Sequence, residues 1–305
     1  MKIGFLGTGL MGLPMAQKLL EANQIVTAYN RIKSKLEPLQ KAGAQIANFP
    51  LKAIQKSECL ILILTNAAAI KNVLLSDSSK AELSHRTVIQ MGTISPAESK
   101  EIRDEIVGCG GEYLEAPVLG SIPQVKSGNL IVMVGASPEQ YQKWSSLLKI
   151  KIFSPEALHI GAVGSGAAIK LATNQLIGSL TTSFALSLGL IIQKKIDVDM
   201  FMQIVRHRAL YAPTFDKKLQ QMLDRNYENP NFPAKHLLKD TNIFINAAES
   251  LGLDVSIQEG VRQVLEKTIE LGLSDLDYSA LMHPYIDICC STACSCRRRC
   301  MEMHR

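Results

Sequence analysis

The sequence predicts an α/β protein in which a doubly wound parallel sheet is followed by an all-α C-terminal domain. Three observations support this fold class. Short β-like runs alternate with helical patterns through the first half of the chain. The run CLILILT at 59–65 is apolar throughout, as expected of a strand that is buried on both faces of a parallel sheet. From about residue 164 the β-like runs stop, and helical periodicity continues almost without interruption.

The expected strands of the first half are short and mostly alternate with helices. They are KIGFLG at 2–7, IVTAYN at 25–30, AQIA at 44–47, CLILILT at 59–65, TVIQMG at 87–92, EYLEAPV at 112–118 and LIVMVGA at 130–136. The helices expected between them span 10–22, 35–43 and 95–110. Gly43 suits the C-terminal end of the second helix. Ser95, with Glu98 three residues later, suits a capping box at the start of the third.

Helical patterns fill the second half of the chain. They cover 165–192, 198–207, 234–250 and 255–272, and LGLSDLDYSAL at 271–281 closes the domain. The expected organisation is an N-terminal domain over 1–163, an all-helical domain over 164–282 and a tail over 283–305. The tail is rich in cysteine and arginine and has no sustained hydrophobic period, so we expect it to be disordered.

The composition is that of an ordinary globular protein, with 47% hydrophobic and 20% charged residues and a net charge of +5. Lysine and arginine are spread along most of the chain, which argues against a nucleic-acid surface. No apolar run reaches the roughly 18 residues of a membrane span. The N-terminus turns to glycine where a signal peptide would stay apolar. We therefore expect a cytoplasmic protein with no nucleic-acid or membrane partner.

The cysteines fall into two groups. Cys59 and Cys109 lie in the body of the chain, which fits a reducing compartment. The other five crowd into the tail, at Cys289, Cys290, Cys294, Cys296 and Cys300. Their spacing matches none of the paired C-x2-C zinc patterns, so no metal site is expected. A metal site there, or contact of the adjacent RRR run with nucleic acid or a membrane surface, is the less favoured alternative.

The segment Gly7-Thr8-Gly9-Leu10-Met11-Gly12 is a G-x-G-x-x-G between an expected strand and an expected helix. Its glycines allow a tight turn and close backbone approach, and the helix N-terminus offers N–H groups to a pyrophosphate. The N-terminal domain is therefore predicted to be a Rossmann-type dinucleotide-binding domain. The residues expected at the cofactor are Gly7, Gly9, Leu10, Met11 and Gly12. The alternative is a glycine-rich turn without a ligand.

The end of the second strand indicates which dinucleotide binds. An NAD site usually has Asp or Glu there to accept from the ribose 2′-hydroxyl. This chain has Asn30 and Arg31, followed by Lys33 and Lys35. Arg31 can form paired hydrogen bonds with a 2′-phosphate, and Asn30 can donate to it. The sequence thus predicts NADP, with NADPH preferred over NADH; the alternative is that Arg31 is only a loop cation.

Two further strand ends carry polar residues. Leu64, Thr65 and Asn66 end the fourth expected strand, and Thr93 follows the fifth. Ligands of open α/β sheets lie outside the carboxyl ends of the strands. We therefore expect these residues at the cofactor, with Thr93 near the nicotinamide, although each alone also suits a turn or a helix cap.

Lys170 is the one cation in the first turns of the long helix at 165–192. Gly166 lies one turn before it and Asn174 one turn after it, so the three share a face. On local pattern alone, solvent exposure of this face is the favoured explanation, and a chemical role for Lys170 is the alternative.

Five segments together resemble the β-hydroxyacid dehydrogenase family, which includes 3-hydroxyisobutyrate dehydrogenase. They are FLGTGLMGLPMAQKLL, EAPVLGSIPQVKSGNLIVMVG, VGSGAAIKLATNQ, FPAKHLLKD and GLSDLDYSAL, in the family's order over residues 1–281. The FPAKHLLKD form and the Asn-Arg pair are most similar to the glyoxylate/succinic semialdehyde reductase branch. The resemblance implies a Rossmann domain and a helical domain, a nicotinamide cofactor, and a homodimer or homotetramer that pairs through the helical domain.

Carried over by residue, the resemblance assigns a role to each matching position. Lys170 is the catalytic acid/base, and Asn174 orients the lysine and the substrate. The segment Leu119, Gly120 and Ser121 holds the substrate carboxylate. Lys239 reaches the cofactor, with Asp240 beside it, and Phe232 packs at the substrate in the cleft between the domains.

The chain departs from the family pattern at two serines and in its tail. Leu119 and Gly92 stand where the family usually has serine, so two hydroxyl groups are missing. The loss of a donor at Leu119 favours a larger or less polar aldehyde acid. The tail turns to Pro and Cys where relatives continue as a helix.

The favoured function is an NADPH-dependent reductase of small aldehyde acids, in which Lys170 donates the proton to the developing alkoxide. Gly166 would leave room for the substrate. One alternative is an NAD(P)-dependent dehydrogenase that oxidises a 3-hydroxy acid. The other is a catalytically silent dinucleotide-binding scaffold, against which Lys170 and Asn174 argue.

Overall fold

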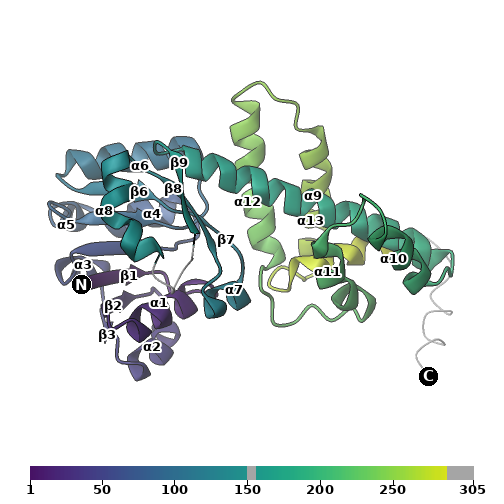
Figure 1. Ribbon diagram of the computed structural model, residues 1–305, viewed down its shortest axis with the longest axis horizontal. Helices are drawn as coiled ribbons and strands as arrows, with labels where there is room; N and C mark the ends of the chain where they lie inside the picture. Colours follow the sequence, from purple (N-terminus) through teal and green to yellow (C-terminus); the bar gives the residue numbers. More distant parts are fainter. Residues whose placement is uncertain (150–155, 287–305) are drawn as a thin grey trace. The chain divides into compact units, whose positions relative to one another are not determined.

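The computed structural model describes residues 1–149 and 156–286. The chain divides into two compact units, residues 1–172 and residues 173–305. The first unit contains a sheet with helices on both faces, and the second is helical (Figure 1). The division falls inside one long helix, α9 (Ser165–Gln193), which begins close to the expected domain boundary.

The sheet of the first unit confirms the predicted α/β fold class. Its strands are β1 (Lys2–Leu6), β2 (Ile25–Tyr29), β3 (Gln45–Ile46), β4 (Cys59–Leu62), β5 (Thr87–Gln90), β6 (Glu112–Glu115), β7 (Val118–Leu119), β8 (Ile131–Gly135) and β9 (Glu156–Gly161). They are ordered β3-β2-β1-β4-β5-β6-β8-β7, with β9 on β8. Strands β1 to β6 pair in parallel, β8 is antiparallel to both β6 and β7, and β9 is parallel to β8.

Each face of the sheet buries its own apolar layer. On β4, Cys59 and Ile61 point into one layer while Leu60 and Leu62 point into the other, because successive strand residues alternate in direction. The first layer is covered by α1 (Gly12–Glu21), η1 (Lys33–Leu36), α2 (Glu37–Lys41), α7 (Ile122–Ser127) and α8 (Pro138–Lys149). The second is covered by α3 (Pro50–Gln55), α4 (Ala67–Leu74) and α6 (Pro96–Gly108), and the short α5 (Asp77–Lys80) follows α4.

The second unit packs its helices around a separate core. Its elements after α9 are α10 (Val198–Arg206), α11 (Pro213–Leu223), α12 (Ala234–Glu249), α13 (Ser256–Glu270), the 3-10 helix η2 (Tyr278–Met282) and α14 (His283–Ile286). Phe184 of α9 stacks on Phe215 of α11, with ring centroids 4.6 Å apart. Lys218 and Asp277 form a buried ion pair of 2.7 Å that joins α11 to the start of η2. Helices α12 and α13 lie side by side (Figure 1).

Several elements differ from the prediction. The strand expected at 112–118 is divided at Ala116-Pro117 into β6 and β7, because proline has no N–H to donate within a sheet. The closing segment at 271–281 becomes helical only from Tyr278. The tail does not begin at 283 as expected, since 283–286 form α14. The cysteines and arginines of 287–305 lie outside the described residues.

Two local predictions are confirmed. Ser95 and Glu98 form the capping box of α6, with both reciprocal hydrogen bonds present. Gly43, which follows the C-cap residue Ala42 of α2, has a φ of +97°, a conformation that favours glycine.

Helix α9 is long enough to span a membrane, although no uninterrupted apolar run in it reaches that length. Its most apolar 18-residue window has a mean hydropathy of 1.6, and 39% of that window is buried within the protein. By length and composition this helix could cross a membrane, as core helices of many proteins could. The sequence hides this because Thr, Asn, Gln and Ser interrupt each apolar run.

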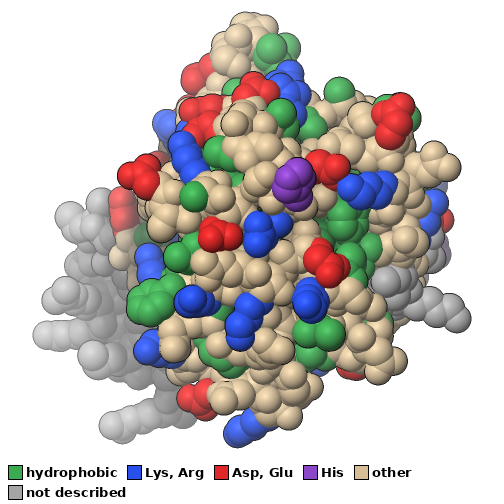
Figure 2. Space-filling model, turned by 90° about the vertical axis from the view of Figure 1, so that its left-hand side faces the viewer, with side chains coloured by type: hydrophobic (Ala, Val, Ile, Leu, Met, Phe, Trp, Pro, Cys, Tyr) green, Lys and Arg blue, Asp and Glu red, His purple; other side chains and the backbone are tan. Residues whose placement is uncertain are grey.

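Figure 2 shows the face of the first unit at which β3, α3 and α5 lie. Lysine and arginine side chains are spread there among acidic, hydrophobic and other residues (Figure 2). Charges of opposite sign are therefore interspersed on this face.

Candidate active site

The carboxyl ends of five neighbouring strands lie level along one edge of the sheet. Tyr29 of β2 pairs with Leu6 of β1, Leu6 with Leu62 of β4, Leu62 with Gln90 of β5, and Gln90 with Glu115 of β6. The segments that follow these residues therefore leave the sheet side by side. They carry the predicted cofactor residues at 7–12, 30–31, 64–66 and 93.

The glycine loop has the shape that a dinucleotide requires. Gly7 has a φ of +104°, and a Cβ there would lie 2.5 Å from the carbonyl oxygen of Ile63. A Cβ on Gly12 would lie 1.9 Å from the carbonyl oxygen of Gly7, so α1 can start only with glycine at that position. A Cβ on Gly9 would meet nothing within 4 Å, which leaves open space over the loop.

The start of α1 presents its backbone to that space. Its N-cap is Met11, and no side chain of the described residues caps it. The first N–H groups of a helix lack partners within the helix and attract an anion. Leu10 is 45% exposed, while Met11 packs against the core below. The loop and this helix start together fit the pyrophosphate of a dinucleotide.

Asn30 is held in place by the glycine loop. Its Nδ2 donates to Thr8 Oγ1 over 2.9 Å, and its Oδ1 accepts from the backbone N–H of Ile32 over 2.8 Å. Thr8 is buried and in turn donates to the carbonyl of Lys35 over 3.3 Å. The second Nδ2 hydrogen of Asn30 remains as a donor. Arg31, next to it, is exposed.

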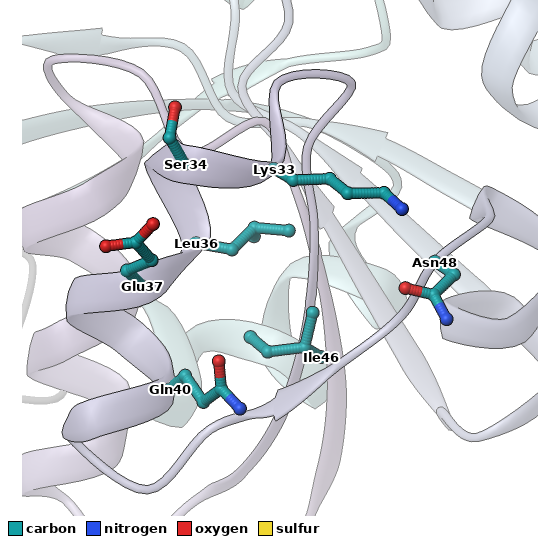
Figure 3. A pocket seen from close by; sticks show the side chains of 7 residues that line it. All are labelled: Lys33, Ser34, Leu36, Glu37, Gln40, Ile46 and Asn48. Carbon is teal, nitrogen blue, oxygen red and sulfur yellow. The ribbon is translucent and has the colours of Figure 1, made fainter.

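A pocket of about 360 Å³ lies beside the segment that follows Arg31. Its lining residues are Lys33, Ser34, Leu36, Glu37, Gln40, Ile46 and Asn48 (Figure 3). The side chain of Lys33 extends toward the side of the pocket formed by Asn48 (Figure 3). None of the predicted site residues lines this pocket.

Some of the residues that follow β4 and β5 have a structural role, and others have exposed or half-buried side chains. Asn66 is the N-cap of α4, and its Oδ1 accepts from the N–H of Ala69 over 2.9 Å. Leu64 lies between two glycines, because a Cβ on Gly7 or on Gly92 would come within 3.0 Å of it. Gly92 therefore has no room for a side chain. Thr65 is exposed and Thr93 half-buried.

The expected substrate segment forms the turn from β7 into α7. Gly120 has a φ of +135°, which favours glycine, and Leu119 is half-buried at the end of β7. Ser121 donates to Gln124 Oε1 from both its N–H and its hydroxyl, over 2.9 and 2.7 Å. The segment is thus an ordered turn whose serine hydroxyl caps a helix.

In the second unit, three of the predicted residues form a chain of contacts. Asn174, 4% exposed, donates from Nδ2 to Asp240 Oδ2 over 2.7 Å. Asp240, 3% exposed, also pairs with Lys239 over 2.7 Å through its other oxygen. Because the amide N–H₂ of Asn174 donates to Asp240, the acceptor of this side chain is its amide oxygen. Lys170, one helical turn before Asn174, is half-buried.

The start of α12 is fixed by the last motif of the chain. Pro233 and Asp277 form an isolated β-bridge, and Tyr278 donates its N–H to the carbonyl of Phe232 over 2.9 Å. The Phe232 ring packs edge-on against Tyr278, with centroids 5.8 Å apart. The FPAKHLLKD and GLSDLDYSAL segments, separate in sequence, are therefore one structural feature.

The predicted role of Gly166 is wrong. A Cβ on Gly166 would lie 2.5 Å from the carbonyl oxygen of Met133 and 3.3 Å from Glu115 Oε1. The space beside this glycine is filled by β8 and by a carboxylate, so it is not left for a substrate. Glycine is needed there because α9 passes close to the sheet.

Two residues at this edge are absent from the sequence-based prediction. Thr8 lies inside the G-x-G-x-x-G motif and holds Asn30. It occupies a position at which the motif specifies no residue type, so the motif does not single it out. Glu115 is 1% exposed and accepts hydrogen bonds from the start of α9. Its burial raises the pKa of its carboxyl, and hydrogen bonds from Ser99 and three backbone N–H groups partly offset that effect. In sequence, its only signal is a charged residue inside an apolar strand.

Among residues 1–149 and 156–286, no group of three or more His, Cys, Asp and Glu side chains is placed to hold a metal ion. The tail cysteines lie outside those ranges.

Both halves of the chain match known families. Residues 2–152 match the NAD binding domain of 6-phosphogluconate dehydrogenase. Residues 164–285 match the family described as NAD-binding of NADP-dependent 3-hydroxyisobutyrate dehydrogenase. The two matches divide the chain near the start of α9.

Similar proteins extend over nearly the whole chain. Glyoxylate/succinic semialdehyde reductase 2, chloroplastic, of Arabidopsis thaliana is 32% identical over 284 residues, which are 92% of this chain and 78% of that protein. Glyoxylate/succinic semialdehyde reductase 1 of the same plant is 29% identical, over 92% of this chain and 97% of that protein. The crystal structure of 3-hydroxyisobutyrate dehydrogenase from Salmonella typhimurium shares the fold, with a TM-score of 0.82, 22% identity, and coverage of 93% of this chain and 99% of that one.

The fold, the glycine loop and these matches define an NAD(P)-dependent oxidoreductase that uses a nicotinamide dinucleotide cofactor. The chain belongs to the β-hydroxyacid dehydrogenase family.

Proposed function

We propose that this protein is an NADPH-dependent reductase of small aldehyde acids of the glyoxylate or succinic semialdehyde type, with Lys170 as the proton donor. The names of its plant relatives support the substrate class. The observation that carries the proposal is the chain of contacts from Lys239 through the buried Asp240 to the buried Asn174, one turn from Lys170. A solvent-facing helix surface would not need its asparagine fixed by a buried carboxylate.

The chemistry divides between the cofactor and this chain's side chains. The bound nicotinamide supplies the hydride. Lys170 donates a proton to the aldehyde oxygen as negative charge develops there, and its own charge stabilises that oxygen beforehand. Asp240 holds the amide of Asn174 so that its oxygen can accept from Lys170 or from the substrate. Lys239, paired with Asp240, is assigned to the cofactor.

The substrate carboxylate is assigned to the turn at 119–121. Gly120 is exposed in that turn. The N–H and hydroxyl of Ser121, which donate to Gln124 Oε1, would turn from that partner to the substrate carboxylate. Leu119 contributes an apolar surface in place of a hydroxyl donor, which favours a longer acid such as succinic semialdehyde over glyoxylate. Phe232 supplies a second apolar contact.

The preference for NADPH rests on Asn30 and Arg31. Thr8 fixes Asn30 beside the glycine loop through one amide hydrogen, which leaves the second as a donor, and the guanidinium of Arg31 is exposed. No carboxylate occupies the position that would accept from a ribose 2′-hydroxyl. Gly7, Gly9, Leu10, Met11, Gly12, Leu64, Thr65, Asn66 and Thr93 complete the proposed cofactor site.

The reverse reaction is the second candidate, because the C-terminal half matches the 3-hydroxyisobutyrate dehydrogenase family. In that direction Lys170 would accept the proton of a 3-hydroxy acid. A screen with both substrate classes and both cofactors distinguishes the two. Faster turnover of 3-hydroxyisobutyrate with NAD than of any aldehyde acid with NADPH would favour the second candidate.

A second copy of the chain is proposed to cover one side of α9. Leu176, Leu180, Leu186 and Leu190 are 56%, 39%, 56% and 60% exposed and recur on one broad side of the helix. No charged residue occurs between 171 and 193. The opposite side of α9 packs in the core of the second unit through Phe184 and Leu188, so the helix is half-buried already. We therefore propose a homodimer or homotetramer, in the cytoplasm, where the free Cys59 and Cys109 fit a reducing compartment.

Replacing Lys170 tests the proposed mechanism. Lys170→Ala is expected to lower kcat for aldehyde reduction by about 10²–10⁴-fold, the usual contribution of a general acid. The Kd for NADPH, measured by fluorescence titration, should stay unchanged. Lys194→Ala, at the end of the same helix, is the matched control and should keep full activity. Turnover that survives Lys170→Ala would refute the assignment.

The substrate class is tested by NADPH oxidation with four aldehyde acids: glyoxylate, succinic semialdehyde, tartronate semialdehyde and methylmalonate semialdehyde. Reduction of succinic semialdehyde with the highest kcat/KM is the expected result. Inactivity on all four would contradict the proposal and favour a dinucleotide-binding scaffold.

A further inference from the structure

Glu115 is the last residue of β6, and its side chain links that strand to the first turn of α9. Its Oε1 accepts hydrogen bonds from the backbone N–H groups of Gly164, Gly166 and Ala167, over 2.7, 2.8 and 3.2 Å. The first N–H groups of a helix have no partner within the helix, and a carboxylate beside them is stabilised by the helix dipole. One side-chain oxygen therefore fixes three backbone N–H groups within the four residues 164–167.

The carboxylate of Glu115 is itself held from the other side. Ser99 of α6, which is fully buried, donates its hydroxyl to Oε2. Tyr113 shares a hydrogen bond of 2.8 Å with the same serine. The contacts that the structure gives Glu115 are thus three backbone N–H groups and one hydroxyl, and each of them donates to it.

Two glycines clear the space for this carboxylate. A Cβ on Gly135 of β8 would lie 2.3 Å from Glu115 Oε1, and one on Gly166 would lie 3.3 Å from it. The backbone of β8 and the start of α9 can approach the carboxylate only because both positions lack a side chain. The close packing of Gly135 and Gly166 therefore leaves room at this point for the hydrogen-bond acceptor of the Glu115 side chain.

The place of Glu115 in the chain connects it to the chemistry. It ends β6, level with the strand ends that carry the cofactor loops, and Leu119 follows four residues later. Gly166, which it binds, lies one turn before Lys170 on the same face of α9. A shift of this first turn would move Lys170 relative to the edge of the sheet.

We infer that Glu115 is a positioning residue for Lys170: it fixes the first turn of α9 to the end of β6, and thereby sets where the Lys170 ammonium lies. The inference rests on the proposed role of Lys170. Glu115 acts through backbone N–H groups and takes no part in proton transfer.

Three variants separate this role from a general effect on folding. Glu115→Ala removes the acceptor, and kcat is expected to fall about 10²-fold, as for a displacement of about 1 Å in a reacting group. Glu115→Gln keeps an oxygen that can accept the same N–H groups, so it should retain most of the kcat. Glu112→Ala is the matched control: this glutamate starts the same strand but pairs with Lys143 at the surface, over 2.8 Å. It should leave kcat unchanged.

Hydrogen exchange gives a second readout that needs no activity. In the cofactor-free protein, the amides of 164–167 should exchange faster in Glu115→Ala than in the wild type, and at wild-type rates in Glu115→Gln and Glu112→Ala. Unchanged exchange in Glu115→Ala would overturn the inference. So would faster exchange without a loss of kcat.

A double-variant cycle tests whether Glu115 acts through Lys170. Glu115→Ala should cause no further loss of turnover in a Lys170→Ala background; an equal loss there would overturn the inference. Full turnover by Lys170→Ala would refute the proposed function, whereas loss by Lys170→Ala but not by Glu115→Ala would refute the positioning role alone. If Glu115→Ala does not fold, Glu115→Asp, which is one methylene shorter, should lower kcat, and full activity of that variant would contradict the inference.

Discussion

Arg31 carries the cofactor preference at the scale of single residues. Its guanidinium is exposed beside Asn30, and that asparagine is fixed to the glycine loop through Thr8. A planar guanidinium matches the geometry of a phosphate, whereas a carboxylate at this point would repel one and accept from a 2′-hydroxyl instead.

Arg31→Asp is therefore expected to lower kcat/KM for NADPH by more than tenfold, about 1.4 kcal/mol, and to raise kcat/KM for NADH. Steady-state kinetics with both cofactors provide the measurement. Lys41→Asp, an exposed change of the same charge at the end of α2, serves as the control. An equal or better kcat/KM of the wild type with NADH would contradict the prediction.

Glu115 gives the protein a pH dependence of known sign. Burial raises the pKa of its carboxyl above the ordinary value of about 4.5. The folded protein therefore holds this proton more tightly than the unfolded chain. Stability contributed by the neutral group is lost as the pH rises from the ordinary glutamate pKa to the raised one, and is constant above it.

Glu115→Gln removes this ionisation, so the free energy of unfolding of the wild type should fall relative to that of Glu115→Gln as the pH rises above about 4.5. Urea denaturation of both proteins at a series of pH values measures the difference. A free energy of unfolding of the wild type that instead rose with pH relative to that of Glu115→Gln would contradict the prediction and show that the fold favours the ionised carboxylate.

At the scale of elements, α9 depends on close approach to the sheet. Gly166 touches the backbone of β8, where a Cβ would lie 2.5 Å from a carbonyl oxygen. Gly178, twelve residues later on the same helix, has its nearest neighbours at 3.5 and 3.6 Å from a Cβ, which is ordinary contact. Close packing against the sheet therefore requires glycine at 166, whereas packing does not require it at 178.

Gly166→Ala should lower the free energy of unfolding by roughly 1–3 kcal/mol, because the backbone carbonyl it meets cannot rotate away. Gly178→Ala should be neutral or stabilising by up to about 1 kcal/mol, the difference in helix propensity between the two residues. Chemical denaturation compares them. Equal effects of the two substitutions would mean that α9 can shift away from β8 at little cost.

Periodicity predicted most elements correctly, and its errors have local causes. CLILILT and the capping box at Ser95 were read correctly because a buried strand and a helix cap depend on the residues in their own segment. The division of 112–118 depended on Pro117, whose effect was overlooked. Strand β9 was missed because it is half exposed and carries no apolar run.

At the scale of the whole molecule, the exposed apolar side of α9 is the surface that a second copy of the chain is proposed to cover. The exposed leucines would lose most of their contact with water in a dimer, at about 25 cal/mol for each Å² buried. A charge placed there would remain unpaired inside the interface.

The double substitution Leu186→Glu with Leu190→Glu is therefore expected to convert an oligomer into a monomer, as measured by analytical ultracentrifugation. Leu251→Glu, at an exposed leucine in the turn after α12, is the control. A wild-type protein that sediments as a monomer would contradict the proposed oligomer.

The sequence by itself determined the α/β class, the order of the two halves and the dinucleotide loop. It could do so because alternation, helical period and glycine spacing are properties of contiguous residues. It also singled out Lys170 and Asn174, since their spacing on one helix is fixed by the helix geometry. The family resemblance, rather than the spacing, gave them a chemical role.

Only the tertiary structure decided what Gly166, Asp240 and Glu115 do. Gly166 lies against β8, Asp240 holds the amide of Asn174, and Glu115 accepts from the start of α9. In each case the partner is distant in the chain, Glu115 and Gly166 being 51 residues apart. A buried polar group is satisfied by whichever donor the fold brings to it, and no local pattern specifies that donor.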